Sequence, residues 1–78
     1  MSTKNKPDKK EVFLSVDSVL SYLSFKTARQ IKQEVNEMLE RQGMPKASLT
    51  DIRAALSQID KDCKLRVRKK TDAYALPN

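Results

Sequence analysis

The sequence predicts a mainly α-helical protein with a small β-hairpin near its C-terminal end. Three segments repeat apolar residues at helical spacing, and each follows a residue that can cap a helix. Residues 64–70 then alternate Leu65 and Val67 with basic residues, which is the pattern of a strand with one apolar and one cationic face. Seventy-eight residues allow one domain at most, so we expect residues 8–78 to share one core.

The first helix is predicted over about residues 9–23. Asp8 and Glu11 have the spacing of a capping box at its start. The apolar residues that share one face of this helix are Val12, Val16, Val19, Leu20 and Leu23. An alternative is that residues 12–14 are extended and that the helix begins at Ser15.

The second helix is predicted over about residues 28–41, after a short connector at 24–26. Thr27 is a suitable N-cap, and Gln30 has the spacing to complete a capping box. The apolar face consists of Ala28, Ile31, Val35, Met38 and Leu39. Gly43 follows the last periodic residue and is the expected stop signal.

The third helix is predicted over about residues 49–61. Ser48 is its N-cap candidate, and Asp51 lies near the positive end of the helix dipole. The buried face is expected to contain Leu49, Ile52, Ala55, Leu56 and Ile59.

The hairpin is predicted to pair residues of about 64–69 with residues of about 73–76. The turn between them lacks an Asn-Gly or Asp-Gly pair, so we expect a long, flexible tip. An isolated two-stranded hairpin is barely stable in water, so this one must pack on the helices. The side chains available for that packing are Leu65, Val67, Tyr74 and Leu76.

The net charge of +6 is concentrated in two places. Residues 64–70 contain five cations and no acid, and residues 1–10 contain four lysines against Asp8. Residues 11–63 are almost neutral, with seven cations and eight acids. We expect residues 1–7 to form a disordered basic arm. Clustered positive charge of this kind indicates contact with a polyanion, and nucleic acid is the main candidate.

The order of helix, helix, turn, helix and basic hairpin resembles the winged helix-turn-helix family of DNA-binding domains. The resemblance covers about residues 11–76, and it is clearest in the Ile52-x-x-x-Leu56-x-x-Ile59 pattern followed by Leu65. The opening of the second helix, Thr27-Ala-Arg-Gln-Ile31, is also similar to the family. The resemblance implies a third helix in the major groove of DNA and a hairpin, the wing, on the adjacent backbone.

The candidate contacts with double-stranded DNA lie on the third helix and just before it, on the hairpin, and at the start of the second helix. Arg53 is the best candidate for a base contact, because a guanidinium can bind guanine through two hydrogen bonds. Basic residues of the hairpin, and residues at the start of the second helix, are expected on phosphates. The full set is Lys26, Thr27, Arg29, Lys46, Ser48, Thr50, Arg53, Ser57, Lys61, Arg66, Arg68, Lys69 and Lys70. We therefore expect a transcriptional regulator or an accessory factor in a DNA transaction.

Several functional classes are disfavoured. The chain has no His, one Gly and one Cys, so we expect no catalytic constellation, no zinc site and no cofactor. Cys63 is expected to be a half-buried structural thiol. No apolar run approaches the roughly 20 residues of a membrane span. A lone thiol fits a reducing, cytoplasmic setting, with nucleoid association if the source is bacterial.

Other interpretations stay open at this point. The acidic stripe Glu34, Glu37 and Glu40 fits a protein-interaction module that docks on a larger assembly. Basic loops and helix ends also fit structured RNA, which is recognised by shape and by phosphate contacts. Leu14, which lies off the apolar face of the first helix, offers a contact for a homodimer. The basic residues also fit a solvated surface that only aids solubility.

Overall fold

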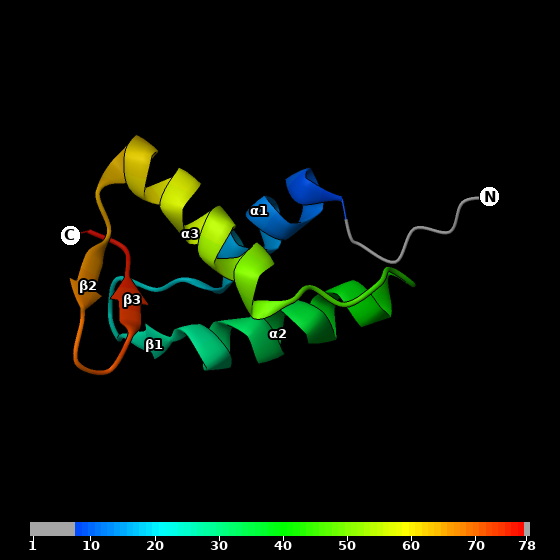
Figure 1. Cartoon of the computed structure of the whole chain (residues 1–78), viewed down its shortest axis with the longest axis horizontal. Coiled ribbons are helices and arrows are strands. Elements are labelled where there is room, and N and C mark those ends of the chain that lie inside the picture. Colours follow the sequence, from blue (N-terminus) through cyan, green and yellow to red (C-terminus); the bar gives the residue numbers. More distant parts are fainter. Residues whose placement is uncertain (1–7, 78) are drawn as a thin grey trace.

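The computed structural model describes residues 8–77. The chain forms α1 (Lys9–Val19), β1 (Lys26–Thr27), α2 (Ala28–Arg41), α3 (Leu49–Cys63), β2 (Arg66–Arg68) and β3 (Ala73–Ala75). The strands form one antiparallel sheet at the end of the molecule where α2 begins and α3 ends (Figure 1). The protein is thus mainly helical with a small sheet, as predicted. The basic arm expected at residues 1–7 lies outside the described residues.

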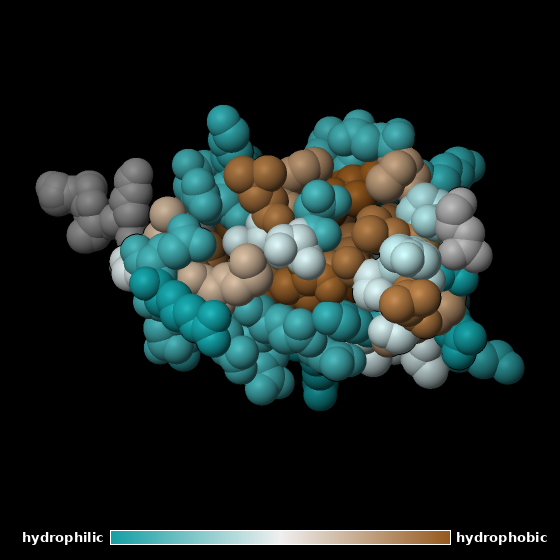
Figure 2. All heavy atoms as spheres, turned by 180° about the vertical axis from the view of Figure 1, so that it is seen from behind, coloured by the Kyte–Doolittle hydropathy of each residue, from teal (hydrophilic) through white to brown (hydrophobic). Residues whose placement is uncertain are grey.

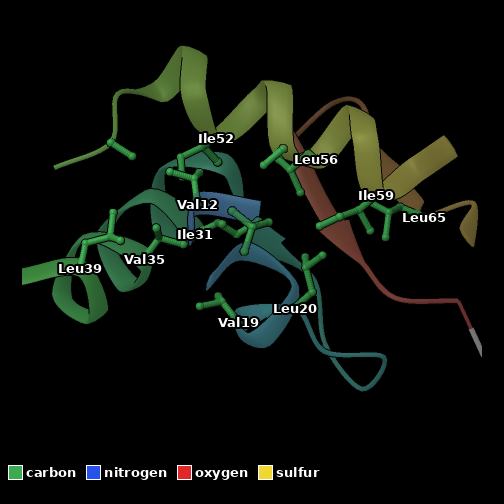
Figure 3. Close-up of a cluster of buried hydrophobic side chains, with 13 residues drawn as sticks. Val12, Val19, Leu20, Ile31, Val35, Leu39, Ile52, Leu56, Ile59 and Leu65 are labelled. Carbon is green, nitrogen blue, oxygen red and sulfur yellow. The ribbon is translucent and has the colours of Figure 1, made fainter. Parts of the chain in front are cut away.

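One apolar core joins the three helices and the start of the hairpin (Figure 3). Its largest fully buried side chains are Ile31, Leu39, Ile52, Ile59, Val16 and Val35. The predicted apolar faces of α2 and α3 are confirmed, although Met38 and Leu49 are only partly buried. A helix with one apolar stripe is stable only when that stripe is covered, and here each helix covers the other two.

The start of α1 agrees with its capping signal. Asp8 has an extended backbone, and its Oδ1 accepts a hydrogen bond from the Lys10 amide at 3.0 Å. The helix runs from Lys9 without interruption, so the alternative of an extended segment at residues 12–14 is wrong.

The end of α1 differs from the prediction, because the helix stops at Val19 and not near residue 23. Leu23, which was placed on the buried face, is 81% exposed. Groups later in the chain occupy carbonyls that would accept from backbone amides in a longer helix. The Lys26 ammonium donates to the Val19 carbonyl at 2.9 Å, and the Leu76 amide donates to the Ser21 carbonyl at 3.0 Å. Tertiary hydrogen bonds therefore contribute to the end of this helix. The sequence contains no residue here that typically caps the C-terminus of a helix.

The bounds predicted for α2 are confirmed. The Thr27 hydroxyl accepts a hydrogen bond from the Gln30 amide at 3.1 Å, which is one half of the predicted capping box. At the other end Gly43 has φ +72°, and the Met44 amide donates to the Leu39 carbonyl at 2.9 Å. This is the Schellman arrangement, which needs a left-handed residue and so favours glycine.

The capping box of α3 is complete. Ser48 Oγ accepts from the Asp51 amide at 3.2 Å, and Asp51 Oδ2 accepts from the Ser48 amide at 3.0 Å. The helix continues to Cys63, two residues beyond the prediction, and Cys63 is exposed, so the expectation of a half-buried thiol is wrong. Residues 60–64 at the end of α3 are all exposed, and the next buried side chain is Leu65, where the chain turns toward β2.

The sheet has the strand order β1-β3-β2, with β3 between two antiparallel neighbours. The third strand, β1, arises from the connector before α2. The hairpin strands are shorter than predicted, and Val67 lies outside the buried core: it is 45% exposed and lines a pocket with Leu56 and Ser57 of α3. Because β3 is central, its Ala73 and Ala75 are buried instead. Leu65 packs in the core as expected.

Candidate nucleic-acid interface

The face of α3 opposite the core is open to solvent. Its exposed residues are Thr50, Arg53, Ala54, Ser57, Gln58 and Lys61. Ala54 and Ser57 are small, so the helix backbone can approach a flat surface or a groove closely. The structure therefore presents the predicted α3 candidates together on one exposed surface.

Arg53 is not a free side chain on this surface. Its Nη1 donates to Asp72 Oδ1 at 3.1 Å and its Nη2 donates to Asp72 Oδ2 at 2.6 Å. The pair joins the middle of α3 to the turn between β2 and β3. Its hydrogen bonds raise the pKa of Arg53 and lower the pKa of Asp72, with further help at Asp72 from Tyr74. Both side chains remain about half exposed, at 49% and 42%.

Asp72 connects three elements. Its carboxylate binds Arg53 on α3, and Oδ1 also accepts from the Tyr74 hydroxyl at 2.9 Å. Partial burial, followed by the contact with Asp72, raises the pKa of Tyr74. The Asp72 carbonyl accepts from the Ala28 amide at 3.0 Å, at the first residue of α2. Asp72 has φ +55°, a conformation that Asp adopts more readily than most residues.

The turn of the hairpin is strongly basic. We define the cationic turn as Arg68, Lys69 and Lys70, all of which are exposed. The ion pairs among residues 8–77 are Lys26–Glu34 and Arg53–Asp72, so the cationic turn takes part in none of them. Its charges are available for a polyanion, and the contacts of Asp72 hold the turn beside α3 and the start of α2.

The two arginines of β2 pack over an aromatic ring. The guanidinium carbons of Arg66 and Arg68 lie 5.2 and 4.3 Å from the centroid of the Phe25 ring. Both arginines pair with alanines of β3, Arg66 with Ala75 and Arg68 with Ala73. Directly opposed side chains in a sheet project from the same face, and alanines leave room for the longer arginines. Phe25 therefore helps to orient this edge of the hairpin.

Arg66 also donates hydrogen bonds to backbone carbonyls within the chain. Its Nε donates to the Leu76 carbonyl at 3.1 Å, and its Nη2 donates to the Tyr22 carbonyl. Of the four hairpin cations predicted to contact phosphate, Arg66 is thus mainly a structural residue. Arg68, Lys69 and Lys70 keep the exposure that such contacts require.

Several candidate groups at the start of α2 also have hydrogen-bond partners within the chain. Lys26 Nζ donates to Glu34 Oε1 at 3.0 Å as well as to the Val19 carbonyl. The amides of Ala28 and Gln30 have partners inside the chain, so they are not free donors for a phosphate. Arg29 is exposed and remains available. The acidic stripe of α2 is interrupted, because Glu34 is neutralised by Lys26.

The segment between α2 and α3 is held by a side chain that the sequence analysis missed. Asn36 Oδ1 accepts from the Ala47 amide at 2.7 Å, and Asn36 Nδ2 donates to the Ala47 carbonyl at 3.2 Å. These bonds place Ser48 and the first turn of α3 against α2. Beside this clamp lies an open groove of about 610 Å³, and its lining includes Arg29, Lys32, Glu37, Glu40 and Lys46. The mixed charges make this groove a poor match for a polyanion.

The far end of α3 carries opposite charges. Lys61 is exposed, but so are Asp60 and Asp62 on either side of it. Asp60 has a structural role, since its Oδ1 accepts from the Leu65 amide at 2.8 Å where the chain leaves the helix. Positive charge without adjacent acids therefore lies at the cationic turn and not at this end of α3.

Sequence patterns could have indicated some of the missed residues. An Asp in the turn of an otherwise basic hairpin fits both a left-handed turn residue and a partner for Arg53. For Asn36 and Phe25 no local pattern exists, because their partners are distant in sequence.

None of the helices within residues 8–77 is both long enough and apolar enough to cross a bilayer. No protein-family model, curated protein sequence or solved structure matches this chain.

Proposed function

We propose that this protein binds double-stranded DNA as a winged helix-turn-helix domain, and that it acts in transcriptional regulation or another DNA transaction. In this proposal α3 enters the major groove, and the β2–β3 hairpin is the wing that contacts the flanking backbone. The observation that carries the proposal is the exposed cationic turn, which makes no ion pair among the described residues and is held beside α3 by Asp72.

Three features support this arrangement. The order α1, β1, α2, α3, β2, β3 places a short strand before the second helix and a hairpin after the third. The exposed face of α3 carries small and polar residues, which suit the width of a major groove. Arg29 adds an exposed cation at the start of α2. The hydrogen bond from the Ala28 amide to the Asp72 carbonyl links this end of α2 to the hairpin.

The test is a salt titration of binding to a mixed-sequence DNA duplex by fluorescence anisotropy. Lys69→Gln/Lys70→Gln removes two charges from the cationic turn. The matched control, Lys9→Gln/Lys10→Gln, removes two exposed charges from α1 at the opposite end of the molecule (Figure 1). Each phosphate contact contributes about 0.9 to the slope of log K against log salt, so the first variant should flatten the slope by up to about 1.8.

The control should leave that slope close to the wild-type value. Equal effects of the two variants would mean that general charge, and not the cationic turn, drives binding. Absence of binding at low salt would reject the proposal. Competition with an RNA duplex of the same sequence separates DNA from structured RNA, and preference for RNA would also reject it.

A second candidate function is docking to a protein. Apolar side chains gather across the middle of the face turned away from the viewer in Figure 1, within a hydrophilic rim (Figure 2). Large exposed apolar side chains of the described chain include Leu14, Tyr22 and Leu23, at 49%, 56% and 81%. Leu14→Ser/Leu23→Ser should weaken such docking and spare DNA binding, whereas the lysine variant of the cationic turn should do the reverse.

A further inference from the structure

The guanidinium of Arg53 has donors that Asp72 does not use. A guanidinium carries five N–H groups in one plane. The contact with Asp72 runs through Nη1 and Nη2, and it engages one N–H of each. Two parallel N–H groups remain unused on the side edge of the guanidinium. They are Nε–H and the second N–H of the terminal nitrogen next to it. The side chain as a whole is 49% exposed, so about half of its surface is open to a ligand.

We propose that Asp72 is a positioning residue that holds Arg53 in place to read one guanine of a DNA duplex. The inference rests on the proposed function and deepens it, since it names the base that α3 reads and the residue that orients the reader. Guanine presents two acceptors, N7 and O6, on its major-groove edge. Adenine presents one acceptor and one donor there, so a parallel pair of N–H donors fits guanine and not adenine.

The anchoring of Asp72 is what makes this role effective. Its carboxylate accepts from the Tyr74 hydroxyl, its carbonyl accepts from the Ala28 amide, and its own amide donates to the Lys69 carbonyl at 3.4 Å. A lysine or arginine normally loses rotamer freedom on binding, and that loss weakens the complex. Arg53 is already held before DNA arrives, so less freedom is lost when it meets the base.

The charge of Asp72 gives the proposal a distinctive signature. A carboxylate near DNA repels phosphate, so its removal should strengthen general attraction to DNA. If Asp72 also orients Arg53, its removal should at the same time weaken base discrimination. Removal of a residue that serves only stability would not raise the general affinity for DNA and lower base discrimination at the same time.

The experiment uses the full chain and a randomised duplex library, from which the preferred sequence of the wild-type protein is selected. Affinity is then measured for that duplex and for duplexes in which each guanine in turn is replaced by adenine, with the paired base changed to match. A bidentate base contact contributes about 1–3 kcal/mol of discrimination, which is a factor of about 5–150 in affinity. The wild type should show a factor in that range at one guanine.

Two variants and one control complete the design. Asp72→Asn keeps the shape and tolerates the left-handed backbone, and Arg53→Met keeps most of the length of the side chain but has no N–H donor. Both should reduce discrimination at that guanine to about twofold or less, and Asp72→Asn should bind mixed duplexes at least as tightly as the wild type. The control Asp62→Asn removes one exposed acid at the end of α3 and should leave discrimination unchanged. If Asp72→Asn proves unfolded by circular dichroism, Tyr74→Phe removes one hydrogen bond that anchors Asp72 and should lower discrimination at that guanine, while Arg53→Met tests the base contact.

Unchanged discrimination in Asp72→Asn would overturn the positioning role, and sharper discrimination would show that Asp72 competes with guanine, which overturns it too. Duplex binding without any guanine preference in the wild type would overturn this inference and leave the proposed function standing. Absence of duplex binding would overturn both.

Discussion

Arg53 in α3 and Asp72 in the β2–β3 turn, nineteen positions apart, are joined by two hydrogen bonds of 3.1 and 2.6 Å. The same aspartate accepts from the first amide of α2 through its carbonyl. Three elements that are far apart in sequence thus meet at one residue. The junction links the cationic turn to α3, because the Asp72 amide also donates to the Lys69 carbonyl at 3.4 Å.

The first prediction concerns pH. Arg53 and then Tyr74 lower the pKa of Asp72 below its ordinary value of 3.8. A carboxylate with a lowered pKa adds stability that is fully present above the ordinary value and is lost as the pH falls through the folded-state value. Urea unfolding should therefore show a stability difference between wild type and Asp72→Asn that is constant near neutral pH and shrinks below about pH 3.8. In an Arg53→Gln background this difference should be smaller near neutral pH, because the main cause of the lowered pKa of Asp72 is removed.

The second prediction concerns the clamp between α2 and α3. Asn36→Ala leaves the amide and carbonyl of Ala47 without their partner in a partly buried place. An unsatisfied polar group of this kind costs about 1–3 kcal/mol, so the variant should lose about that much free energy of unfolding. Gln33→Ala, at an exposed position of the same helix, should change it by less than about 0.5 kcal/mol. Equal losses in chemical denaturation would contradict a specific role for Asn36.

The third prediction concerns the aromatic support of β2. The Arg68 guanidinium carbon lies 4.3 Å from the centroid of the Phe25 ring. Exposed cation–π pairs contribute about 0.5–1 kcal/mol. A double-mutant cycle of Phe25→Leu and Arg68→Gln should therefore give a coupling of that size in thermal or urea unfolding. A parallel cycle of Phe25→Leu and Lys69→Gln provides the reference, and it should show coupling close to zero.

The fourth prediction separates two leucines that the helical pattern treats alike. Leu20 is 6% exposed and lies in the core, whereas Leu23 is 81% exposed. Leu20→Ala should reduce the free energy of unfolding by about 2–5 kcal/mol, because it removes buried methyl groups and leaves a cavity. Leu23→Ala should change it by less than about 0.5 kcal/mol. Similar losses would mean that residue 23 is buried in solution.

The sequence predicted many residues of the candidate site, but it did not predict which of them are already bound to other groups of the chain. The α3 candidates do share one exposed face, and the cationic turn is exposed. Two other candidates, Lys26 and Arg66, donate to carbonyls of the segment after α1. A positive charge in a sequence does not reveal whether a partner within the chain already uses it.

The sequence by itself determined both ends of α2 and the start of α3, because capping and helical periodicity act between residues only three or four positions apart. It also determined which residues of these helices form the core. Only the tertiary structure decided where α1 ends, that Phe25 supports two arginines, and that Arg53 is held by Asp72. Those outcomes depend on contacts such as Lys26 with Val19, seven positions apart, and Arg66 with Tyr22, forty-four positions apart. Such contacts join residues beyond the three- or four-residue range of capping and helical periodicity, so no local pattern predicts them.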